Sequence, residues 1–130
     1  MAASILIIED NLNNLALMDY LLQAFGYIPL QAQDGIAGLA MIRSEMPDLI
    51  LCDIQLPLLD GFGIAKALKC DEKLSVIPLI AVTALAMVGD KEKILKAGFD
   101  GYITKPITPE TFIGEVEKFL STENLSRMNR

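Results

Sequence analysis

Acidic, hydroxyl and basic side chains stand at the ends of four short apolar runs of the sequence. Glu9 and Asp10 follow the first run, and further runs are followed or closed by Asp53, Thr83 and Lys105. Carboxylates gathered within several Å repel one another by roughly 1 to 4 kcal/mol per pair at effective dielectrics between those of water and a protein surface, so the cluster needs a cation. Oxygen ligands favour Mg²⁺ over zinc. The hydroxyl and the ammonium add donors for an oxyanion.

The elements that must bring these residues together are five apolar, β-branched runs that alternate with segments of helical spacing. The predicted strands are Ile5–Ile8, Ile28–Gln31, Leu49–Cys52, Leu79–Val82 and Gly101–Thr104. Strict alternation of strand and helix predicts a parallel sheet with helices on both faces. The carboxyl ends of all five strands then meet at one rim, where ligands bind in folds of this class.

The predicted helices lie between these strands. The first is capped by Asn13 or Asn14, ends at Gly26 and carries Leu15, Met18, Leu22 and Phe25 on one face. The next three cover about 35–45, 61–70 and 88–97, and the fifth has a stripe of Phe112, Val116, Phe119 and Leu120. One polar strand end would be an ordinary surface feature, but polar groups at all of these ends together predict a site.

Composition excludes several classes of function. A chain of 130 residues with 52% hydrophobic and 22% charged residues predicts one compact domain. A net charge of −6 argues against binding nucleic acid and favours protein partners. We expect no membrane span and no secretory signal, and therefore a cytoplasmic protein. Without histidine, the chain has no Ser-His-Asp catalysis and no phosphohistidine of its own. We expect Cys52 and Cys70 to be buried small residues, not a disulfide.

Four motifs together resemble the receiver domains of two-component response regulators. They are residues 8–11 (IEDN), residues 51–57 (LCDIQLP) with Asp60-Gly61, residues 81–84 (AVTA), and Lys105-Pro106. The resemblance covers nearly the whole chain and is closest to single-domain receivers of the chemotaxis and cell-cycle type. It implies an α/β fold: a three-layer (βα)5 flavodoxin-like fold whose five-stranded parallel sheet has the order 2-1-3-4-5. Residues 1–122 would form the receiver domain and 123–130 a flexible C-terminal tail.

The resemblance also implies a role for each site residue. Asp53 would accept a phosphoryl group from a phosphohistidine of a histidine kinase or histidine phosphotransfer protein. Glu9, Asp10 and Asp53 would hold Mg²⁺ together with the backbone carbonyl of Gln55. Lys105 would pair with a phosphoryl oxygen, and its bond to Pro106 is a candidate cis peptide. Such a chain is a signalling phosphoacceptor, with at most intrinsic autophosphorylation and autodephosphorylation activity.

The switch residues implied by the resemblance are Thr83 and Tyr102. The hydroxyl of Thr83 would bond the phosphoryl group and Tyr102 would turn inward, which would alter a face formed by residues 88–97, strand 101–104 and the last helix. A downstream protein would read that face. For Tyr102, a role as an ordinary strand aromatic stays equally open. A large Leu85 beside the acyl phosphate predicts slow autodephosphorylation.

The phosphodonor must approach the acidic pair, where Leu12, Asn14 and Leu15 begin the first helix and Ile107 flanks the other side. Leu15 fits the core equally well. Met87 and Val88 are candidates for an adaptable apolar contact in the switching region.

Three alternatives remain open on the sequence. A haloacid-dehalogenase-type phosphatase also uses Asp, Thr and Lys around Mg²⁺, but its nucleophile follows the first strand in a DxDx(T/V) pattern, whereas residues 9–13 read EDNLN. A flavodoxin would place the FMN phosphate after the first strand, where two carboxylates would repel it. A degenerate receiver would lack some of the phosphorylation residues, which are all present here.

Overall fold

Five parallel strands form a single sheet in the order β2-β1-β3-β4-β5, which confirms the predicted order. The computed structural model describes residues 2–84 and 88–128. The strands are β1 Ser4–Ile8, β2 Ile28–Ala32, β3 Leu49–Asp53, β4 Leu79–Thr83 and β5 Gly101–Thr104. The helices are α1 Leu12–Ala24, α2 Gly35–Glu45, α3 Gly61–Lys69, α4 Val88–Ala97 and α5 Pro109–Met128. None of the helices within the described ranges is long and apolar enough to cross a membrane.

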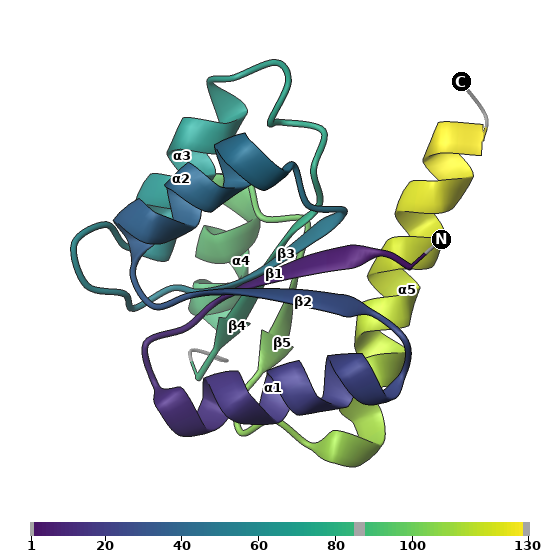
Figure 1. Ribbon diagram of the computed structural model, residues 1–130. Helices are drawn as coiled ribbons and strands as arrows, with labels where there is room; N and C mark the ends of the chain where they lie inside the picture. Colours follow the sequence, from purple (N-terminus) through teal and green to yellow (C-terminus); the bar gives the residue numbers. More distant parts are fainter. Residues whose placement is uncertain (1, 85–87, 129–130) are drawn as a thin grey trace.

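The sheet is buried between two layers of helices, and α1 and α5 cover one face while α2, α3 and α4 cover the other (Figure 1). Successive residues of a strand point to opposite faces, so Ile5 and Ile7 pack with α1 and α5 whereas Leu6 and Ile8 pack on the other side. Strands β1, β3 and β4 are almost wholly buried. Their near-continuous apolar runs follow from this burial on both faces.

Helix α1 begins two or three residues earlier than predicted. Asn11 is its N-cap and accepts a hydrogen bond from the backbone N of Asn14 at 3.0 Å, so the prediction that Asn13 or Asn14 caps the helix is wrong. Asn11 has the extended backbone that a cap requires. Phe25, predicted on the buried stripe, is the C-cap and is exposed, and Gly26 follows with φ 88°.

The structure differs from two further predictions. Cys52 is buried and Cys70 is exposed, and both are free thiols; the prediction of a buried Cys70 is wrong because this residue caps the C-terminus of α3 at the surface. Helix α5 continues to Met128, where the sequence predicts a frayed tail. No Gly or Pro follows Gly114 to stop the helix. The flexibility of residues 123–130 stays a prediction.

The connection from β3 to α3 is folded tightly against the end of β3. The backbone N of Gly61 donates to the carbonyl of Ile54 at 2.8 Å, and Asp60 caps α3 by accepting from the N of Gly63 at 2.8 Å. A Cβ at position 61 would lie 2.7 Å from Ile54 Cα and 2.8 Å from Asp53 O. Only glycine allows this close approach, which fixes the backbone around Asp53.

Gly61→Ala should therefore lower the free energy of unfolding by about 1–3 kcal/mol, since the backbone must shift to admit the methyl group. Gly114→Ala is the matched control, because nothing lies within 4 Å of a Cβ added there in α5. That substitution should raise stability by about 0.5–1 kcal/mol through helix propensity. Urea unfolding of both variants measures the difference, and equal effects would contradict the close-approach argument.

Candidate functional site

Four of the predicted site residues lie together at the carboxyl ends of the strands. Glu9 follows β1, Asp53 and Thr83 are the last residues of β3 and β4, and Lys105 follows β5. Glu9, Asp53 and Thr83 are the buried polar residues among those described, and as whole residues they are 1%, 8% and 2% exposed. In an otherwise apolar interior, polar burial confined to one rim marks the site.

The ammonium of Lys105 joins the two buried carboxylates. Its Nζ lies 2.8 Å from Glu9 Oε1 and 2.9 Å from Asp53 Oδ2. The second oxygen of each carboxylate accepts from the backbone two residues ahead: Glu9 Oε2 from the N of Asn11 and Asp53 Oδ1 from the N of Gln55, both at 3.1 Å. These bonds fix both carboxylates in place at the buried side of the rim.

Asn11 has a structural role that the sequence analysis did not assign. Its backbone N–H bonds Glu9 and its side chain caps α1, so one residue connects the acidic site to the start of the helix. A polar residue directly before an apolar helical stripe is a known N-cap signal, and that signal could have identified it.

Burial sets the protonation of the site. It raises the pKa of Glu9 to about 6; the hydrogen bond from Lys105 opposes this shift and neighbouring Asp53 adds to it. For Lys105, burial alone would lower the pKa, but the bonds to Glu9 and Asp53 outweigh it, so that its pKa is raised. Lys105 is therefore a fixed positive charge at neutral pH, and Glu9 is a carboxylate that retains a proton to an unusually high pH.

The three carboxylates fit a hard cation. One ligand oxygen from each of Glu9, Asp10 and Asp53 lies within 4.8 Å of the others, and Asp10 is the exposed member. Glu9 Oε1 is buried and, apart from its ion pair with Lys105, has no hydrogen bond among the described residues. An all-oxygen set containing a buried oxygen with unused bonding capacity suits Mg²⁺.

The proposed switch residues lie on neighbouring strands. Thr83 is paired with Thr104 in the β4–β5 register, and the backbone N of Lys105 donates to Thr83 O at 2.8 Å. Tyr102 is half-buried, and Lys91 Nζ of α4 lies 5.5 Å from the centre of its ring. Its ring therefore borders α4.

Other predicted residues divide between core and surface. Leu15 and Ile107 are buried in the core beside α1 and α5, while Leu12 is 63% exposed. Asn14 is half-buried. Leu85, Met87 and the side chain of Val88 lie outside the described residues. The predicted cis peptide Lys105-Pro106 is present.

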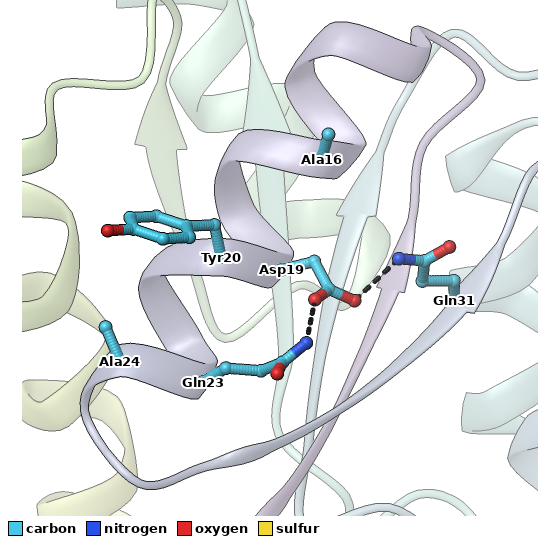
Figure 2. A pocket seen from close by; sticks show the side chains of 6 residues that line it. All are labelled: Ala16, Asp19, Tyr20, Gln23, Ala24 and Gln31. Carbon is cyan, nitrogen blue, oxygen red and sulfur yellow. Dashed lines mark hydrogen bonds between the residues drawn. The ribbon is translucent and has the colours of Figure 1, made fainter.

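A hollow of about 510 Å³ lies away from this site, on the outer surface of α1 and β2 (Figure 2). Its one charged residue is Asp19, whose carboxylate accepts hydrogen bonds from Gln23 and from Gln31, the latter at 2.6 Å. Tyr20 borders it with its ring exposed. The hollow has no cationic side chain among its lining residues, so it does not offer a phosphate site.

The raised pKa of Glu9 predicts a pH-dependent contribution to stability in metal-free buffer. A carboxyl group whose pKa rises from 4.5 to about 6 on folding stabilises the protein below pH 4.5, and this contribution is lost as the pH rises through 6. The difference in unfolding free energy between wild type and Glu9→Gln should fall by about 1.5 kcal/mol from pH 4.5 to pH 7.5. Urea unfolding at both pH values measures it. A difference that does not change with pH would rule out a raised pKa.

Comparisons with known proteins agree with the site. Residues 5–117 match the response regulator receiver domain family. The polar-differentiation response regulator DivK of Brucella ovis is 45% identical over 120 residues, which cover 92% of this chain and 98% of that protein.

Solved structures give the same result. The chemotaxis response regulator CheY4 of Vibrio cholerae has a TM-score of 0.87 and 25% identity, covering 92% of this chain and 99% of that one. The receiver domain of a sensor histidine kinase of Pseudomonas aeruginosa PAO1, solved with a magnesium ion coordinated in its active-site cleft, has a TM-score of 0.84 and 30% identity over 93% and 99% of the two chains. The chain belongs to the receiver-domain family of two-component response regulators.

Proposed function

We propose that Asp53 is the phosphoacceptor of this receiver domain and that Glu9, Asp10, Asp53 and the backbone carbonyl of Gln55 hold Mg²⁺ beside it. The observation that carries the proposal is the position of Lys105, whose ammonium bonds both Glu9 and Asp53 within 3 Å. A fixed cation at that place can pair with a phosphoryl oxygen once the group is attached to Asp53.

The reaction is a transfer of a phosphoryl group from nitrogen to oxygen. A carboxylate oxygen of Asp53 attacks the phosphorus of a phosphohistidine on a kinase or phosphotransfer protein. The P–N bond breaks, its electron pair stays on the imidazole, and an acyl phosphate forms on Asp53. Bound Mg²⁺ would supply neutralisation of the charge that develops on the phosphoryl oxygens. Little covalent chemistry is needed from the protein, because such transfers depend on positioning and charge.

The proposed output lies beside the site. We infer that the Thr83 hydroxyl bonds the phosphoryl group and that Tyr102 responds by moving inward. A hollow of about 530 Å³ beside Tyr102 supports an output face formed by α4, β5 and α5. The residues that line it with Tyr102 are Leu95, Asp100, Gly101, Thr104, Glu115, Lys118 and Phe119. A downstream protein would bind this face, and the cytoplasm is the proposed compartment.

Family membership favours this function over the phosphatase and flavodoxin alternatives. The domain is a signalling domain, and intrinsic autophosphorylation and autodephosphorylation are the proposed limits of its own activity. Slow autodephosphorylation stays a prediction that depends on Leu85.

Incubation with Mg²⁺ and acetyl phosphate should add one phosphoryl group to the wild type and none to Asp53→Asn, because the amide cannot act as the nucleophile. Intact-mass spectrometry at acidic pH measures the product. Asp71→Asn is the matched control and should leave labelling unchanged. Asp71 lies beyond α3, at the opposite end of the sheet, where it accepts hydrogen bonds from Lys73 N and Leu74 N. Labelling of Asp53→Asn at the wild-type rate would refute the assignment.

Affinity for Mg²⁺ should depend on pH through Glu9. Because a proton and the ion compete for a carboxyl group of pKa about 6, the wild type should bind Mg²⁺ about tenfold more weakly at pH 5 than at pH 7.5. Isothermal titration calorimetry measures both affinities. Glu9→Gln should bind Mg²⁺ more weakly at pH 7.5 and show a smaller change with pH; a wild-type affinity that is the same at both pH values would contradict a role for Glu9.

A further inference from the structure

Leu58 has two properties that the packing of the fold does not explain. Its φ is 70°, and Met46 is the other non-glycine residue with a positive φ in the described part of the chain. Its side chain is 78% exposed, the highest value among the exposed large hydrophobic residues of that part. A leucine is disfavoured in the left-handed region by contacts of its Cβ, and an exposed leucine gains nothing from burial. Glycine or asparagine would suit this backbone better.

The backbone that carries Leu58 is held on both sides. The carbonyl of Pro57 accepts hydrogen bonds from Gly35 N at 3.2 Å and from Leu59 N at 2.8 Å. A Cβ at Gly35 would come within 1.7 Å of the carbonyl oxygen of Leu59, so the loop is pressed onto the start of α2. Asp60 then caps α3 directly after the loop. These contacts fix the backbone conformation and present the Leu58 side chain to solvent at a defined position.

That position lies on the rim around the phosphoacceptor. Leu58 follows Asp53 by five residues in the connection at the carboxyl end of β3. The same rim carries Leu12 at the start of α1 and Ile36 at the start of α2, which are 63% and 55% exposed. The Asp53 side chain is only 10% exposed, so a phosphohistidine held by a protein can reach it only if that protein covers the rim.

We propose that Leu58 is a docking residue for the protein phosphodonor, and that it buries its side chain against an apolar surface next to the phosphohistidine. The inference rests on the proposed function of Asp53. Leu58 contributes to association and not to the chemical step, because its side chain carries no group that can act on phosphorus. A small phosphodonor such as acetyl phosphate does not cover the rim, so the rate at which it phosphorylates Asp53 does not depend on the Leu58 side chain.

The test compares a protein donor with a small donor. The protein donor is a purified histidine kinase, radiolabelled on its histidine and chosen because it phosphorylates the wild-type chain. Leu58→Gly removes the side chain and is compatible with φ 70°. It should raise the KM for the kinase about tenfold with little change in kcat, since a leucine side chain loses its burial at the interface. Labelling by acetyl phosphate should stay at the wild-type rate.

Met46→Gly is the matched control. Met46 also has a positive φ, 47°, and is 46% exposed, but it caps α2 before β3, at the opposite end of the sheet. It should leave the transfer from the kinase unchanged. Leu58→Met keeps an apolar side chain of similar size, so its KM for the kinase should stay close to that of the wild type.

Each other outcome overturns the inference. Unchanged KM in Leu58→Gly, or an equal rise in Met46→Gly, removes the docking role. An equal loss with acetyl phosphate means that Leu58 supports the site itself, and a loss of wild-type self-association on sedimentation would assign the side chain to a second copy of this chain. Absence of acetyl phosphate labelling in the wild type is a separate result that refutes the role of Asp53.

Discussion

The ion pairs of Lys105 with Glu9 and Asp53 are the interactions on which the site depends. Two carboxylates held in a largely buried rim repel each other and lose hydration, and the raised pKa of Glu9 records that cost. The ammonium lies within 3 Å of an oxygen of each and offsets the repulsion. Buried ion pairs are weak contributors to net stability, because desolvation opposes the Coulombic gain. The arrangement is therefore better explained by its chemistry than by stability.

The fold makes this arrangement possible through its parallel sheet. Glu9, Asp53 and Lys105 are separated by many residues in sequence. Glu9 follows β1, Asp53 ends β3 and Lys105 follows β5, and the carboxyl ends of these strands share a rim of one sheet. The apolar burial of β1 and β3 on both faces fixes their register, since a slip by one residue would move every side chain to the other face. The core therefore determines the distances between charged groups that lie at its edge.

Local patterns predicted the strands, because apolar runs alternate with segments of helical spacing, and they predicted that the polar strand ends would meet at one rim. The order of the sheet came from the resemblance to receiver domains, and the roles of the site residues stay a proposal. The sequence did not predict features that depend on backbone geometry or on exposure. Three asparagines stand near the start of α1, and only the extended backbone at Asn11 selects the cap. Cys70 is the C-cap of α3, beyond Leu68, which is the last buried residue of that helix. The positive φ of Leu58 could not be predicted from its residue type, because leucine is not a residue that usually adopts this conformation.

The short distance between the site and the proposed output face follows from the same sheet. Thr83 ends β4, and Lys105 directly follows β5, with its backbone N bonded to Thr83 O. Tyr102 pairs with Ala81, two residues before Thr83 in the same β4–β5 register. Because side chains two residues apart point to the same face of a strand, a shift of Thr83 toward a phosphoryl group would act on the side of the sheet where Tyr102 borders α4. The proposed switch therefore needs no long chain of intermediate residues, because only the two adjacent strands β4 and β5 separate the rim from the packing of α4.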